Sequence, residues 1–141
     1  MNPFQTRLFD LIEKFHPQMM VDKDALKQFI EERADAASTA YEKATQDGHV
    51  HLEAMEISNE TLYNGLDFAP IELLTEIAES NDLPTEETEL LVVFFKTKSI
   101  FDRYPTTAKD FEVSLEREQL KKELELYIIQ NGLLKETAPT R

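Results

Sequence analysis

The chain contains no cysteine, only three glycines and a long central stretch without a basic residue. The absence of cysteine excludes a disulfide framework, a thiolate nucleophile and any zinc or iron–sulfur site with cysteine ligands. Each of Gly48, Gly65 and Gly132 follows a helical pattern and is predicted to cap the end of a helix. Glycine-rich phosphate loops need several closely spaced glycines between a strand and a helix, so nucleotide binding through such a loop is not predicted.

Long apolar runs are also missing. The longest one, residues 90–95, is far shorter than the roughly 18 residues that a membrane-spanning helix requires. Near the start of the chain, Arg7, Asp10 and Glu13 interrupt any apolar segment of the kind found in signal peptides. We therefore expect a cytoplasmic protein that makes no contact with a membrane.

The central stretch is strongly acidic. Residues 44–95 include twelve carboxylates and neither lysine nor arginine, and the whole chain has a formal net charge of −13. Such a charge repels nucleic acid, whose binding needs a field of lysine and arginine, and attracts basic partners. The sequence therefore predicts a basic protein partner rather than direct nucleic-acid binding. The alternative is that these acids only solvate the outer faces of helices.

Apolar residues recur at helical spacing along most of the chain, which predicts an all-α fold. A length of 141 residues fits a single domain, and we expect one helical bundle of about six helices over residues 1–134. Residues 135–141 are predicted to form a disordered tail. The expected helices cover residues 2–16, 22–47, 52–64, 70–80, 85–104 and 114–131.

The fifth of these segments has two possible interpretations. Its apolar run, residues 90–95, is compatible with a strand as well as with a helix. A start at Thr85, acids in the first turns and bases toward the far end favour one helix of about eighteen residues, which is too long for a strand.

The second and third segments are expected to pack closely. The second has an alanine-rich face that includes Ala34 and Ala37, so a neighbouring helix can approach it and the segment is predicted to be central. On the third segment, an apolar side is expected that comprises Leu52, Met55, Leu62 and Leu66. Arg33 interrupts the apolar stripe of the second segment, and we interpret it as paired with a nearby carboxylate rather than as a ligand-binding residue.

The three histidines are weak candidates for metal ligands. Glu13 and His16 form one Glu-x-x-His pair, whereas a di-metal bundle needs two, and His16 is interpreted as a residue that interacts with helix-terminal carbonyls. His49 and His51 supply only two nitrogens at a helix junction, fewer than a zinc site requires. No catalytic residue, metal ligand or cofactor is predicted.

The proposed partner site is an acidic face around Glu72, Glu76, Glu79 and Asp82. The predicted function is that of a non-enzymatic protein–protein interaction module, with a DNA mimic as its sharper form. Replacing the four acids together should raise stability and weaken association, and a loss of stability would mean that they are paired within the fold. The alternative is a metal-dependent enzyme that uses carboxylates and histidines of the bundle. The sequence also leaves open whether the protein forms a homodimer.

Several residue groups occur in order along nearly the whole chain, namely His16, Pro17, Phe29, Ile30, residues 33–37, residues 41–44, Gly48, Leu62, Gly65, Leu66, Phe68, Tyr104, Pro105 and residues 126–128. With these residues the sequence resembles the bacterial family catalogued as domain of unknown function 1896. This resemblance implies an all-helical fold and small cytoplasmic proteins that are often associated with mobile genetic elements. It assigns no catalytic residue.

Overall fold

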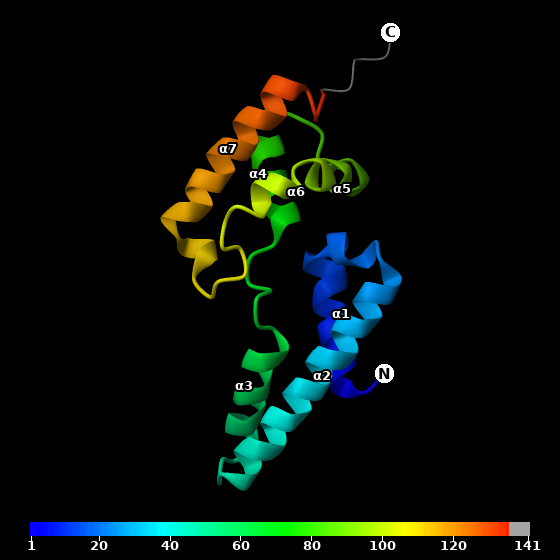
Figure 1. The fold of residues 1–141 in the computed structure, drawn as a ribbon, viewed down its shortest axis with the longest axis vertical. Helices are drawn as coiled ribbons and strands as arrows, with labels where there is room; N and C mark the ends of the chain where they lie inside the picture. The colour runs from blue at the N-terminus through cyan, green and yellow to red at the C-terminus, as the bar shows by residue number, and fades with distance from the viewer. Residues whose placement is uncertain (136–141) are drawn as a thin grey trace. The chain divides into compact units, whose positions relative to one another are not determined.

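The computed structural model describes residues 1–135, which form α-helices and two short 3₁₀ helices and include no strand (Figure 1). This confirms the all-α class. The chain divides into two compact units, Met1–Leu66 and Asp67–Arg141. The single domain over residues 1–134 stays a prediction, and the predicted tail lies outside the described residues except for Lys135. Within residues 1–135, no helix is both long enough and apolar enough to span a membrane.

The first unit begins with two well-capped helices. The Asn2 side chain accepts a hydrogen bond from the Gln5 amide at 2.8 Å, and the Gln5 side chain accepts one from the Asn2 amide at 3.0 Å. Asp22 caps the next long helix by accepting a hydrogen bond from the Ala25 amide at 3.0 Å. The elements of this unit are α1 (Pro3–Phe15), the 3₁₀ helix η1 (Pro17–Met20), α2 (Lys23–Gln46) and α3 (His51–Leu62).

Within this unit α2 packs against both α1 and α3, and α2 and α3 lie side by side in Figure 1. Ala34 and Ala37 are fully buried on α2, and Ala54 and Ser58 are fully buried on α3. Small side chains on both helices let the two backbones approach closely, as the alanine-rich face predicted. Of the predicted apolar side of α3, Leu62 is fully buried, whereas Leu52 is 74% exposed.

The second unit contains one break that the sequence pattern did not predict. A single helix was expected from residue 85 to residue 104, but the helix is interrupted at Thr97, which is fully buried. The Thr97 hydroxyl donates to the Val93 carbonyl at 2.8 Å, and this carbonyl also accepts from the Thr97 amide at 2.9 Å. Back-bonding of this kind by threonine often bends a helix. The elements are α4 (Pro70–Ser80), α5 (Glu87–Lys96), α6 (Lys98–Phe101), the 3₁₀ helix η2 (Phe111–Val113) and α7 (Leu115–Asn131).

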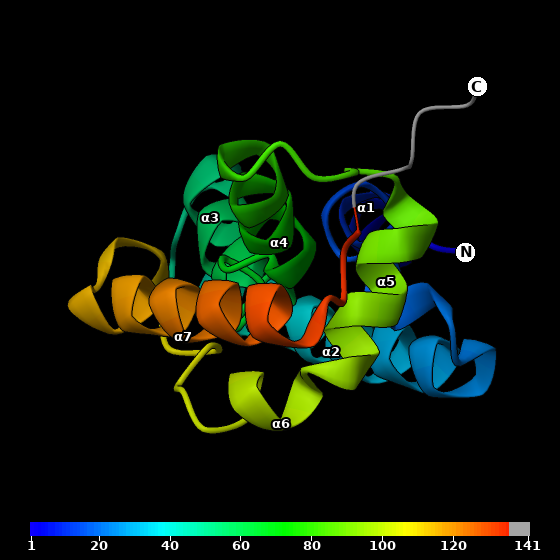
Figure 2. The same ribbon diagram turned by 90° about the horizontal axis from the view of Figure 1, so that it is seen from above.

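In the second unit α4 packs against α5 and α7, and α6 packs against α7 (Figure 2). The Ser114 side chain caps the start of α7, close to the predicted start of this helix, and Gly132 ends it in the left-handed region at a φ of 58°, as predicted. The largest fully buried side chains of this unit come from η2, α4, α5 and α7, namely Phe111, Leu73, Leu74, Ile77, Leu90, Val93, Leu120, Leu124 and Ile128.

Candidate functional site

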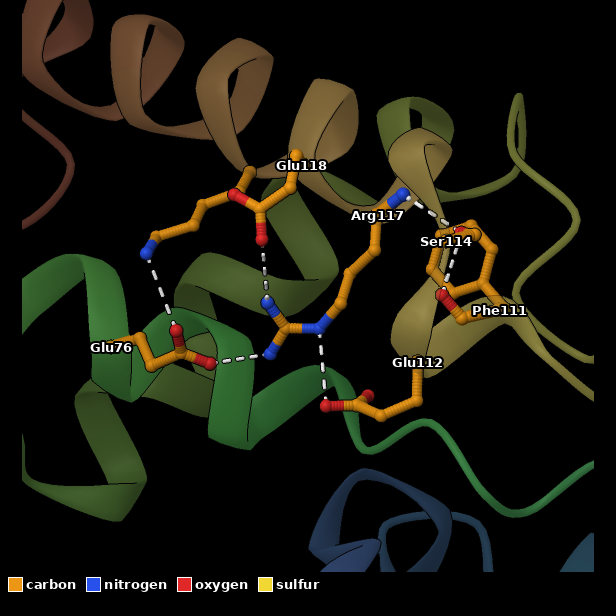
Figure 3. Close-up of polar contacts among 7 residues, drawn as sticks. Glu76, Phe111, Glu112, Ser114, Arg117 and Glu118 are labelled. Atoms are coloured by element: carbon orange, nitrogen blue, oxygen red, sulfur yellow. Dashed lines mark hydrogen bonds and ion pairs between the residues drawn. The ribbon is translucent and has the colours of Figure 1, made fainter.

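A cluster of charged side chains joins three elements of the second unit around Arg117 (Figure 3). Arg117 lies in the first turn of α7 and is only 8% exposed. Its guanidinium pairs with Glu76 of α4, with Glu112 of η2 at 3.1 Å and with Glu118 at 3.7 Å. The Ser114 cap of α7 accepts a hydrogen bond from the Arg117 amide at 3.1 Å and so fixes where this side chain starts.

The ion pairs of the cluster favour the charged forms of its central side chains. A hydrogen bond from Arg117 lowers the pKa of Glu76, outweighing partial burial, and Lys121 contributes from 3.3 Å. Burial alone would lower the pKa of Arg117, but the hydrogen bond to Glu76 and the charge of Glu112 together raise it. Both members of the central pair therefore stay ionised around neutral pH.

This arrangement stabilises the fold of the unit and leaves no charged group of the central pair free to bind a ligand. The Arg117 guanidinium already has three carboxylate partners, so it is not available to bind an anion, and the Glu76 carboxylate is engaged by two cations. Glu76 was predicted to contact a basic partner, and the structure shows it in ion pairs with Arg117 and Lys121 within the unit. Arg117 was missed by the sequence analysis, because nothing in its local sequence links it to a helix 41 residues away.

The other predicted partner-binding residues are placed differently. Glu72, Glu79 and Asp82 are exposed and form no ion pair with any residue of the described part of the chain. We call these three residues the acidic surface. Glu79 lies in the last turn of α4, which contains no basic residue, so its charge opposes the helix dipole. Glu79 and Asp82 are therefore placed where their charges do not stabilise α4, whereas Glu72 lies in the first turn of α4, where a negative charge is favourable.

Asp82 also has an unfavourable backbone conformation. It is the one non-glycine residue among residues 1–135 with a positive φ, at 54°. The Leu83 amide donates to the Ala78 carbonyl at 2.8 Å and the Asp82 amide donates to the Glu79 carbonyl at 3.4 Å, which is the Schellman pattern that usually has glycine in this position. The sequence analysis missed this cap because it looked only for glycine, although aspartate is among the residues that tolerate the left-handed region.

Replacing Asp82 with glycine is expected to raise the free energy of unfolding by about 1 kcal/mol, because it relieves the left-handed strain and removes a negative charge from the end of α4. Urea unfolding followed by circular dichroism measures this change. The variant Asp82→Ala is the matched control, since it removes the same charge and keeps the strain. A glycine variant no more stable than the alanine variant would contradict the assigned strain.

The histidines have separate partners. His51 Nδ1 and the Tyr41 hydroxyl form a hydrogen bond of 2.7 Å, and His49 Nδ1 lies 3.6 Å from the Glu53 carboxylate. His16 is buried, and its Nε2 donates to the Leu66 carbonyl at 2.9 Å. This carbonyl belongs to a later segment. The expected partner was a carbonyl at the end of the helix that precedes His16. Among the described residues, no three histidine or acidic side chains are grouped so that they could hold a metal ion.

Arg33 also has a structural role, but with partners other than those predicted. Its Nη1 donates to the Asn64 carbonyl at 2.6 Å and to the Leu62 carbonyl at 3.3 Å, just at and beyond the end of α3. Its guanidinium also lies 4.7 Å from the centre of the Phe29 ring. The expected carboxylate partner is therefore replaced by backbone carbonyls, which carry partial negative charge at a helix C-terminus. Burial lowers the pKa of Arg33.

Comparison with known proteins agrees with the resemblance noted from the sequence. The family described as "Domain of unknown function (DUF1896)" matches residues 1–133. The crystal structure of protein PG0816 from Porphyromonas gingivalis is similar to this chain, with 30% sequence identity and a TM-score of 0.77, over 98% of this chain and 93% of that one. No curated protein matches the chain. The chain therefore belongs to the family that carries domain of unknown function 1896.

Proposed function

We propose that this protein is a non-enzymatic interaction module whose acidic surface, Glu72, Glu79 and Asp82, binds a basic partner protein. The observation that carries the proposal is that these three carboxylates lack a counter-charge within the described residues, and that two of them, Glu79 and Asp82, occupy positions at the end of α4 that disfavour them. Strain and unpaired charge that cost stability are common where a surface serves a ligand or partner. Glu76 is not part of the proposed surface, because Arg117 and Lys121 already neutralise it.

The neighbouring sequence adds to the same charge. Glu86, Glu87 and Glu89 follow Asp82 within a few residues and are exposed at the start of α5. None of them forms an ion pair within residues 1–135. A series of uncompensated charges of one sign steers an oppositely charged partner and accelerates its association. The proposed partner is therefore a protein with a patch of lysine and arginine.

The salt dependence of binding tests this proposal. The full chain is immobilised and exposed to a lysate of the source organism, and retained proteins are eluted as the salt concentration rises from about 50 to 300 mM, where screening becomes strong. We expect proteins with basic surfaces to elute within this range. Retention that does not change with salt, or the absence of any retained basic protein, would contradict the proposal.

A more specific form of the same proposal is that the protein is a DNA mimic. In this form the partner's basic surface is one that also binds duplex DNA, and the acidic surface competes for it. The test is a titration of the protein into a complex of the retained partner with labelled duplex DNA. Release of the DNA supports mimicry, whereas a complex of all three components assigns the two ligands to different surfaces of the partner.

The metal-dependent enzyme is the remaining alternative, and metal analysis of protein purified without an affinity tag distinguishes it. The described histidines and carboxylates are dispersed or paired with other side chains, so we expect less than a tenth of an equivalent of any transition metal, an order-of-magnitude threshold for adventitious binding. One equivalent of bound metal would contradict the non-enzymatic proposal and support the enzyme.

A further inference from the structure

The first unit contains a pocket that none of the preceding functional arguments uses. It has a volume of about 420 Å³ and lies between α1, η1 and the first turns of α2. This volume falls in the range of about 300–1,000 Å³ that is typical of small-molecule sites. The acidic surface belongs to the other unit, so the pocket is a separate feature of the protein.

The walls of the pocket are almost entirely apolar. They include Phe9 of α1, Met20 of η1 and Leu26 and Ile30 of α2, whereas Gln5 is the one uncharged polar side chain among the lining residues. A ligand body with several hydrogen-bonding groups would leave those groups without partners in such a pocket, at a cost in free energy. The lining therefore favours a hydrocarbon chain, and the flexible Met20 side chain can adapt to its shape.

The pocket is lined by two basic residues, although the unit as a whole is acidic. Residues 1–66 contain twelve carboxylates and only six lysines and arginines, yet two of these six, Lys23 and Lys27, line the pocket. They are four residues apart on α2, so they lie on the same face of the helix. Neither lysine forms an ion pair with a residue that the structure describes.

Most other cations of this unit have evident partners. Arg7 lies over the Phe4 ring at 5.0 Å and Lys14 lies over the Phe15 ring at 5.2 Å. Arg33, as described above, binds carbonyls around the end of α3. Lys23 and Lys27 are therefore positioned to receive an anionic group from a ligand. Glu31 lines the pocket one turn beyond Lys27, so an anionic group is favoured at the Lys23 end.

We infer that this pocket binds an aliphatic carboxylate, with the hydrocarbon chain against Phe9, Leu26 and Ile30 and the carboxylate near Lys23 and Lys27. The assignment follows from the combination of an apolar pocket with two lining lysines that form no ion pair among the described residues, on an otherwise acidic unit. Charge complementarity at the rim favours the carboxylate over a neutral or cationic amphiphile of the same length.

Methyl NMR of the full chain, titrated with decanoate below its micelle concentration, tests this inference. We expect saturable shifts at the methyl groups of Met20, Leu26 and Ile30. The variant carrying both Lys23→Gln and Lys27→Gln should bind decanoate about three- to tenfold more weakly, because two exposed charge contacts are lost. Lys14→Gln with Lys43→Gln is the matched control, which removes the same charge elsewhere in the unit and should change the affinity less than about twofold.

Decyltrimethylammonium, a cation of similar chain length, is the second probe and should bind more weakly than decanoate. The inference is overturned if decanoate does not shift these methyl groups, if the two double variants bind it equally, or if the cation binds at least as tightly. The last result would indicate general attraction to an acidic protein instead of a pocket with a basic rim.

Discussion

Replacing Arg117 with glutamine is expected to lower the free energy of unfolding by about 2 kcal/mol. The substitution leaves Glu76, Glu112 and Glu118 near one another without the cation that they share. Removing one partner of a fully buried ion pair costs about 3–5 kcal/mol. The three carboxylates here are 42–56% exposed, so solvent screening reduces the expected loss to the lower value. Urea unfolding at pH 7 measures the loss.

Arg103→Gln is the matched control for this prediction. Arg103 also forms an ion pair in the second unit, with Glu123, but its side chain is 60% exposed. An exposed pair of this kind contributes about 0.2–1 kcal/mol, so the control variant should lose at most about half as much stability as the Arg117 variant. Equal losses in the two variants would mean that the cluster around Arg117 has no special structural role.

The same cluster predicts a pH dependence. Because the pKa of Glu76 is lowered in the folded protein, its contribution to stability is present above its unfolded pKa, near 4.5, and is lost as the pH falls through the folded value. We expect the wild-type protein to lose stability from about pH 5 downward and Glu76→Gln to lose less over the same interval. Parallel pH profiles for the two proteins would contradict the assigned pair.

Local signals allowed much of the fold to be predicted from the sequence. Asn2, Asp22 and Ser114 begin helices because their side chains accept hydrogen bonds from free amides, and Gly132 ends one because it adopts a positive φ without strain. The break at Thr97 could not be predicted in the same way. A threonine inside an apolar helical pattern is ordinary, and the interruption accompanies its complete burial in the folded unit.

The candidate site was only partly predictable for a related reason. Helical periodicity correctly placed Glu72 and Glu79 on an exposed face of α4, and it gave Glu76 the same role. What separates Glu76 from the other two is a pairing with Arg117 across a long sequence separation, which periodicity does not encode. Replacing all four predicted acids together would therefore combine relief of repulsion with loss of this pair.

Neutralising the acidic surface alone is expected to weaken binding to the basic partner by about tenfold or more. The variant carries Glu72→Gln, Glu79→Gln and Asp82→Asn and leaves Glu76 in place. Each interfacial charge contributes on the order of 0.5–1 kcal/mol, so three of them exceed the 1.4 kcal/mol that corresponds to a factor of ten. Stability should stay unchanged or rise slightly, because no ion pair among the described residues is lost. Calorimetric titration of the variant with the retained partner measures the affinity.

A second triple variant separates a local effect from one of net charge. Asp10→Asn, Glu42→Gln and Glu60→Gln remove three exposed charges of the first unit that are also unpaired within residues 1–135. This control has the same net charge as the acidic-surface variant, and its affinity should change less than about threefold, since distant exposed charges are screened. Equal losses of affinity would assign binding to the overall charge of the protein.

The most direct test of the account is an NMR map of the residues that the partner contacts. The full chain, labelled with nitrogen-15, is titrated with the partner retained in the salt-dependent experiment, at a salt concentration that permits binding. The account predicts the largest amide shifts at Glu79, Asp82 and the residues that lead into α5, and small shifts around Lys23 and Lys27. Shifts confined to the first unit, with α4 unaffected, would contradict the claim that the acidic surface binds the partner.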